Sequence, residues 1–375
     1  MKGIATRELS MAIALLAIWG FFAWAEPVFL SARNLSLLSV ELAITAVLAL
    51  GMLVVLLPGQ IDLSAGSGVG LAGAVAAVLV FWHDVPAPLA LLVATVGAVL
   101  VWSAMGALIA IERIPAFIMT LGGLLVFRGL HWLVIENPTV PVVEGGRDNV
   151  YSLLTTYFLP PLAGYALAGL AVAALVAATL RARARRKAYG FAVDDAELTF
   201  LKLFVLAQLV FLVVIVTNGY RGVPVALVIL AAVAVLVHQL VTNTPFGRYL
   251  YAIGGNEEAA TVSGVPVRAA IIGAYALMGG IVALTGFMQT AYSGASTSTV
   301  GSLMELDAVA ACVIGGTSLR GGRGTVLGVL FGALIMASLL NGMTLMAVSP
   351  EAKYIARGAV LALAVWLDLR LGQAR

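Results

Sequence analysis

Long apolar runs separated by short polar stretches dominate this chain. Most runs contain about 20 residues, the length that crosses a bilayer as an α-helix, and they end at prolines, glycines and charged residues. The run at 303–315 is counted as a span, short or broken, and a merged or re-entrant span would lower the total. We therefore predict an all-α polytopic membrane protein, a bundle of about 10–12 transmembrane helices. The runs lie at about 9–29, 35–57, 63–82, 89–111, 116–135, 158–180, 198–217, 223–241, 269–290, 303–315, 325–346 and 354–369.

Composition agrees with this pattern. The 375 residues are 62% hydrophobic and only 10% charged, with a mean hydropathy of +1.07. A soluble domain is typically about 25% charged, so these charges are too few to cover a globular surface. The single cysteine, Cys312, excludes a disulfide framework. We therefore expect one transmembrane domain over residues 1–375.

The sequence contains no recognisable chemistry of its own. It has no glycine-rich phosphate loop with a following lysine, no nucleophile elbow and no cysteine–histidine metal set. We therefore expect no catalytic, cofactor-binding or metal-binding residue. The net charge of +3 is typical of a membrane protein with positive loops, and no basic cluster interleaved with aromatic residues indicates nucleic-acid binding.

The distribution of lysine and arginine predicts the orientation. If the N-terminus is cytoplasmic and the spans alternate, 15 of the 21 Lys and Arg residues fall on the cytoplasmic side and Arg128 lies inside a span. The five outside are Arg33, Arg147, Arg221, Lys353 and Arg357. Cytoplasmic loops carry an excess of these residues. Both termini, a basic segment at 181–197 and the loop 242–268 are therefore predicted to be cytoplasmic, and the loop 136–157 to lie outside.

The loop 242–268 contains a short predicted helix. Asn256 suits the N-cap, and Glu257 and Glu258 follow in the first turn, where carboxylates favour the positive end of the helix dipole. Gly264 is suited to end the helix. A short rigid helix fixed between two membrane spans can transmit a force from another protein, and our functional prediction depends on it.

Four polar residues near membrane depth are candidates for a translocation path or gate: Asp62, Ser64, Arg128 and Asp307. Glu305 is a further ionisable group beside Asp307. Each has a structural alternative. Asp62 can cap a helix at the break where it lies with Ser64, Arg128 can form an ion pair or extend toward the outer interface, and Glu305 and Asp307 can cap the short run.

Four motifs resemble one family over nearly the whole chain: 247–264, 117–129, 59–64 with its Ile-Asp-Leu-Ser, and 313–325. Together they resemble the permease subunits of ABC sugar importers in the ribose, xylose and galactose group. That family often has two glycines before Ile-Asp-Leu-Ser, whereas this chain has Pro58 at the first position.

Within this family the D-xylose permeases give the strongest resemblance. Their longer chains carry a basic segment, a Tyr-Gly-Phe and a further pair of spans, which 181–187, 189–191 and 218–222 match here. The resemblance implies transport of a monosaccharide, D-xylose or another pentose.

The resemblance also implies partners in the bacterial inner membrane. They are a second copy of the permease, two copies of an ATP-binding subunit that supplies the energy, a periplasmic sugar-binding protein, and lipid. The segment that contacts the ATP-binding subunit would include Gly247, Arg248, Asn256, Glu257, Glu258, Ala259, Ala260, Ser263 and Gly264.

Two other functions stay open from the residues alone. An ion-coupled secondary sugar transporter would use Asp62 or Asp307 to carry the coupling charge. A channel or scaffold would need no energy source.

Overall fold

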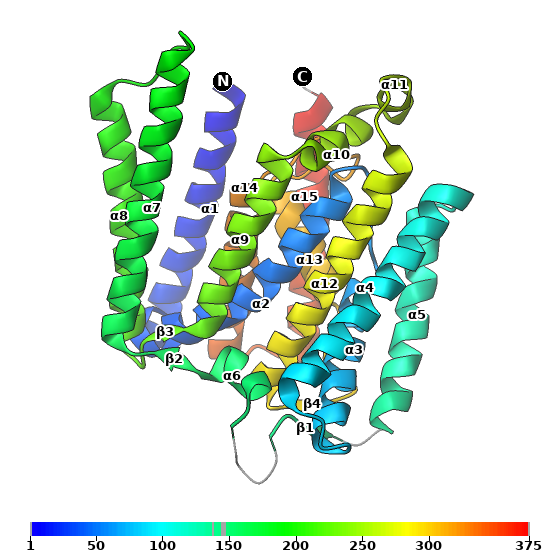
Figure 1. Ribbon diagram of the computed structural model, residues 1–375. Helices are drawn as coiled ribbons and strands as arrows, with labels where there is room; N and C mark the ends of the chain where they lie inside the picture. Colours follow the sequence, from blue (N-terminus) through cyan, green and yellow to red (C-terminus); the bar gives the residue numbers. More distant parts are fainter. Residues whose placement is uncertain (1, 137–138, 144–147, 374–375) are drawn as a thin grey trace.

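The computed structural model describes residues 2–136, 139–143 and 148–373. Nearly all of its regular structure is helical, as the apolar runs predict (Figure 1). The elements are α1 (Lys2–Ala25), η1 (Pro27–Leu30), α2 (Ala32–Leu56), α3 (Ala65–Phe81), α4 (Ala87–Glu112), α5 (Ala116–Ile135), β1 (Val140–Pro141), α6 (Val150–Thr156), β2 (Phe158–Leu159), α7 (Pro161–Ala188), α8 (Ala196–Asn218), β3 (Val223–Pro224), α9 (Val225–Asn243), α10 (Pro245–Gly255), α11 (Glu257–Val262), α12 (Val267–Ser293), β4 (Ala295–Ser296), α13 (Met304–Ile314), α14 (Val326–Leu345) and α15 (Pro350–Gln373).

The predicted all-α polytopic class is confirmed. Within the described residues, eight helices are long and apolar enough to cross a membrane, and two shorter apolar helices, Met11–Ala25 and Ala65–Phe81, accompany them. The short run at 303–315 forms α13, which has 11 residues. At about 1.5 Å per residue such a helix covers about half of a hydrocarbon core of about 30 Å, so α13 does not span.

Helices α2 and α12 form the centre of the bundle. In their most apolar stretches 78% and 67% of the residues are buried, against 22% in α5, 11% in α7 and 6% in α8. Helix α12 packs against α2, α3 and α4, and α14 packs against α13 and α2. A Cβ at Gly332 of α14 would overlap the carbonyl of Ala311 in α13, so glycine permits this close crossing.

Two small antiparallel ribbons lie at one end of the bundle. Strand β1 pairs with β4, and β2 pairs with β3. Figure 1 shows them, with α6, at the end opposite both termini. Each strand has two residues, and none was predicted because such pairs form only after the helices bring distant segments together.

The termini, the α7–α8 turn, α10 and α11 lie at the same end of the bundle (Figure 1). The described part of the loop 136–157 lies at the opposite end; residues 137–138 and 144–147 are outside the described residues. The segments predicted to be cytoplasmic thus share one end of the bundle, and the loop predicted to lie outside is at the other end. That the end with the termini faces the cytoplasm stays a prediction.

Candidate coupling segment and buried charges

Helix α10 opens the predicted coupling segment. Its N-cap is Thr244, whose hydroxyl accepts a hydrogen bond from the Gly247 amide at 3.3 Å. Leu250 and Ile253 are buried, whereas Arg248 points to the exposed face. A Cβ at Gly247 would overlap the backbone of Val241, so glycine is required for this tight turn from α9.

Helix α11 forms as the sequence predicts. The Asn256 side chain accepts a hydrogen bond from the Ala259 amide at 2.9 Å, which confirms Asn256 as the N-cap. Gly264 follows the helix with a φ of +81°, a conformation that glycine adopts without strain. Ala260 faces the protein and is buried, while six candidates on this short helix and its flanks are exposed: Asn256, Glu257, Glu258, Ala259, Ser263 and Gly264.

An apolar tip on α11 was missed by the sequence reasoning. Val262, the last residue of the helix, is 90% exposed, although it lies in a polar loop outside the apolar runs. A single exposed apolar side chain is common on a protein surface, so Val262 is a candidate contact only because α11 is the segment predicted to bind another protein. The available sequence signal was an apolar residue placed between the polar residues Thr261 and Ser263.

Helix α10 is joined to the ends of three core helices. The Tyr251 hydroxyl donates to the Gly324 carbonyl at 2.7 Å, just before α14 begins. The Gly322 amide donates to the carbonyl of Leu57, at the end of α2, at 2.9 Å. The first contact connects α10 to the turn between α13 and α14, and the second connects that turn to the end of α2, so α11 is joined to the core through α10.

Asp62 is fully buried in the break between α2 and α3. Its Oδ1 accepts hydrogen bonds from the Ser64 amide at 2.8 Å and the Ser64 hydroxyl at 2.6 Å. Its Oδ2 accepts one from the Trp102 indole of α4 at 2.7 Å. Both Asp62 and Ser64 have no exposed surface, so neither faces a path in this conformation. The N-cap of α3 is Ser64, which has no side-chain capping bond, and the Asp62 carboxylate instead holds Ser64 and ties the break to α4.

Glu305 and Asp307 lie in the first turn of α13 and are 5% and 7% exposed. The Glu305 carboxyl is next to Gly66 at the start of α3, where a Cβ would overlap it. A carboxylate is favoured beside a helix N-terminus. The starts of α3 and α13 therefore meet around Glu305.

Asp307 has a partner that the sequence did not reveal. Its Oδ1 lies 3.4 Å from Nε of Arg357 in α15. The sequence reasoning counted Arg357 with the outer cations, but this contact places its side chain within the bundle. A charge in the apolar run of α15 was the available signal. The pair borders a cavity of about 170 Å³ with an otherwise mainly apolar wall that includes Leu303, Leu306, Met336 and Tyr354.

Among the described residues Arg128 forms no ion pair with these carboxylates, although it lies close enough to Glu305 to act on it electrostatically. It lies on the exposed face of α5, with its guanidinium carbon 5.8 Å from the centre of the Trp132 ring. The structure thus brings Asp62 and Ser64 together, pairs Asp307 with Arg357, and leaves Arg128 on an outer face. Among the described residues, no group of three or more His, Cys, Asp or Glu could hold a metal ion.

Comparison with known proteins identifies the family. Residues 34–365 match a family described as "Branched-chain amino acid transport system / permease component". The chain is 39% identical over 369 residues to the xylose transport system permease protein XylH of Escherichia coli strain K12, covering 98% of this chain and 93% of the relative. The chain belongs to this permease family.

The permease is similar to two other sugar import permeases of Escherichia coli strain K12. It is 31% identical over 374 residues to the galactose/methyl galactoside import permease protein MglC, covering 96% and 94% of the two chains. It is 31% identical over 361 residues to the ribose import permease protein RbsC, covering 96% and 93%. No solved structure matches the permease. Family and structure together make it a transport subunit and a multi-pass inner-membrane protein.

Proposed function

We propose that this permease forms the membrane path of an ABC importer for D-xylose or another pentose. The observation that carries the proposal is full-length similarity to a named xylose permease at 39% identity, against 31% to the galactose and ribose permeases. The basic segment at 181–187 and the pair of helices that follows it, α8 and α9, support the same choice, because these features resemble the xylose type.

Two copies of an ATP-binding subunit would drive transport from the end that carries α11. The support is geometric, because α11 is exposed, capped and joined through α10 to α2 and the α13–α14 turn. Coupling needs contacts that differ between two states of the ATP-binding subunits. In this proposal ATP is bound only by those subunits, and the permease has no cofactor or nucleotide site of its own.

The path itself would form between two copies of the permease. The exposed face of α5 carries Arg128 together with Gly122 and Gly129, beside which no atom of the chain would meet a Cβ. An arginine on a lipid-facing surface at membrane depth is costly, whereas one facing water or another chain is not. This face therefore suits a seam around a path, to which a periplasmic sugar-binding protein delivers the sugar from the opposite end.

Uptake into proteoliposomes tests the proposal. Purified permease is reconstituted with its ATP-binding subunit, and the sugar-binding protein, radiolabelled D-xylose and ATP are each added or omitted. We expect accumulation only when all components are present and ATP is on the side of α11, with excess unlabelled D-ribose and D-galactose competing weakly. Accumulation by the permease alone in response to a proton gradient would instead establish an ion-coupled secondary transporter, and equilibration without any energy source would establish a channel.

A further inference from the structure

The hairpin of α7 and α8 ends in a cationic surface that the proposed transport function does not use. We define the cationic tip as Arg181, Arg185, Arg186 and Lys187, all exposed at the end of α7. Figure 1 shows the hairpin standing at one edge of the bundle, with α5 at the opposite edge. Its low burial means that most of its length faces outward.

The position of the tip follows from helix geometry. Helix α7 runs without interruption from Pro161 to Ala188, and residues 161–180 are free of charge. Twenty residues at about 1.5 Å each cover about 30 Å, the thickness of the hydrocarbon core. The four cations therefore begin where the hydrocarbon ends, at the level of the lipid headgroups.

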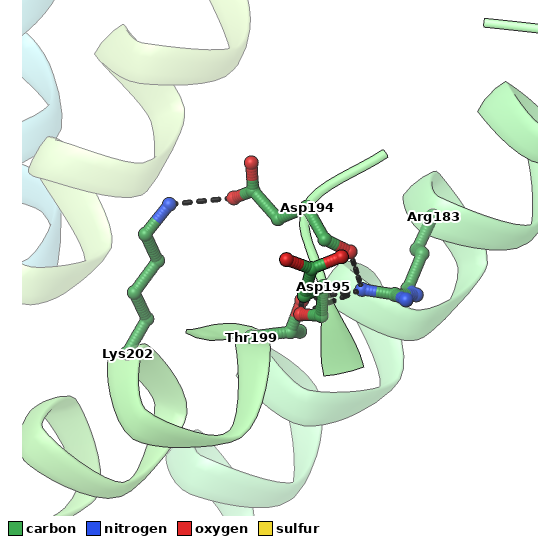
Figure 2. A network of polar contacts seen from close by, with 5 residues as sticks. All are labelled: Arg183, Asp194, Asp195, Thr199 and Lys202. Atoms are coloured by element: carbon green, nitrogen blue, oxygen red, sulfur yellow. Dashed lines mark hydrogen bonds and ion pairs between the residues drawn. The ribbon is translucent and has the colours of Figure 1, made fainter. Parts of the chain in front are cut away.

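Two nearby cations, Arg183 and Lys202, take part in a local polar network and are not counted in the cationic tip. Figure 2 shows Arg183 turned toward the start of α8, where it donates hydrogen bonds to the carbonyls of Asp194 and Asp195 and to the Thr199 hydroxyl. The Lys202 ammonium lies 2.5 Å from the Asp194 carboxylate, and this contact holds the pKa of Asp194 below its ordinary value. The network ties α7 to α8 and keeps Asp194 ionised and occupied.

The tip keeps an excess of positive charge, although Asp194 lies within electrostatic reach of Arg186. None of its four cations has an ion-pair partner among the residues that the structure describes. Between residues 181 and 202 there are six Lys and Arg against three Asp and Glu. Beside the tip, Tyr189 and Phe191 are 74% and 63% exposed, and aromatic side chains of this kind favour the membrane–water interface.

We propose that the cationic tip binds the anionic headgroups of phospholipids in the cytoplasmic leaflet. Charge complementarity supports this partner, because clusters of four or more Lys and Arg directly beyond a membrane helix attract anionic lipid. Position supports it as well. The hairpin has lipid-level aromatics and an outward apolar surface, and it lies away from α11, the segment proposed to contact the ATP-binding subunit (Figure 1).

The test compares lipid binding by the full-length permease and two triple variants. Detergent-solubilised permease is titrated with phosphatidylglycerol or phosphatidylcholine, and bound lipids are counted by native mass spectrometry. In R181Q/R185Q/R186Q we expect affinity for phosphatidylglycerol to fall on the order of a hundredfold, since each surface cation contributes roughly a fivefold factor. Binding of phosphatidylcholine should not change. The matched control R181K/R185K/R186K keeps the charge and should bind like the wild type.

Two further measurements keep the result decisive. The wild-type preference for phosphatidylglycerol should weaken strongly between about 0.1 M and 1 M salt, where screening lengths fall from about 10 Å to about 3 Å, and this needs no variant. Equal phosphatidylglycerol binding by the wild type and the glutamine variant would overturn the proposal. So would unchanged lipid binding accompanied by lost co-purification of the ATP-binding subunit, which would assign the surface to that protein.

Discussion

Asp62 shows how a charge at membrane depth can be structural. Its carboxylate accepts three hydrogen bonds, two from Ser64 and one from Trp102, with no exposed surface. Such a group fixes the break between α2 and α3, at the end of α2 that also contacts the turn beside α10. Sequence alone gave two interpretations, because the distance between Asp62 and Trp102 is set only when α4 packs.

Replacing Asp62 tests this interpretation. Asp62→Ala leaves the Trp102 indole and the Ser64 donors buried without an acceptor, so we expect a loss of stability on the order of 3 kcal/mol. Ser64→Ala removes one donor and keeps the carboxylate occupied, and should cost about 1 kcal/mol. Thermal unfolding of detergent-purified protein gives the order of the two variants. A proton-coupling role would instead leave Asp62→Asn as stable as the wild type while abolishing gradient-driven uptake.

The Asp307–Arg357 pair makes a second residue-scale prediction. Arg357→Met leaves the nearly buried Asp307 carboxylate without its partner. Because the Arg357 side chain is 27% exposed, we expect a cost of about 1–2 kcal/mol, below the roughly 3 kcal/mol of a fully buried pair. The double variant Asp307→Leu/Arg357→Met removes both charges and should recover most of that loss, because an apolar pair fits the mainly apolar wall of the cavity. The checking measurement is a double-mutant cycle on thermal stability. Additive losses would show that the two side chains do not interact.

At the scale of elements, α11 is the helix that the sequence predicts most directly. Its N-cap, its acidic first turn and its terminal glycine act within a few residues of one another, so local rules are sufficient. The exposed Val262 tip and the Tyr251–Gly324 contact depend on the surrounding fold and were not foreseen.

The Val262 tip gives the element-scale prediction. Val262→Asp places a charge at this candidate contact, and we expect binding of the ATP-binding subunit to weaken at least tenfold, which corresponds to about 1.4 kcal/mol. Val262→Ile keeps the apolar surface and serves as the control. Affinity is measured by titrating labelled ATP-binding subunit onto the permease in nanodiscs. Wild-type affinity in the aspartate variant would remove Val262 from the interface.

The joint after α11 is expected to affect coupling more than docking. Gly264 has a φ of +81°, which a β-branched residue adopts only with strain, so Gly264→Val should shift the angle between α11 and α12. We expect ATP hydrolysis to continue while D-xylose uptake falls severalfold in proteoliposomes. Ser263→Ala, an exposed neighbour in the same segment, loses only a local hydrogen bond to the Ala259 carbonyl and is the milder comparison. An unchanged ratio of uptake to hydrolysis in Gly264→Val would contradict the role of this joint.

At the scale of the whole molecule, apolar length was the most informative signal. It located the membrane helices and the short α13, because the bilayer imposes a fixed length on any spanning segment. Pairings across the bundle were not predictable in this way. The contact of Arg357 with Asp307 and the pairing of β1 with β4 join segments that are far apart in sequence, and only the packing of the helices specifies them.

The burial of the helices also predicts where a second copy lies. The face of α5 with Arg128 and the hairpin of α7 and α8 are both weakly buried, and both carry bare glycines, Gly122 and Gly129 on α5 and Gly169 on α7. Only α5 carries an arginine at membrane depth. In a background with Cys312→Ala, we therefore expect Leu125→Cys on α5 to form an intermolecular disulfide under mild oxidation in native membranes. Leu125 is 67% exposed, and Leu209→Cys on α8, 53% exposed in the wild type, is the matched control that should stay monomeric. Non-reducing gel electrophoresis reads out both variants. A crosslink through Leu209→Cys and none through Leu125→Cys would contradict this prediction. The two copies would then meet at α8, and the path proposed to lie between them would be on that side of the molecule.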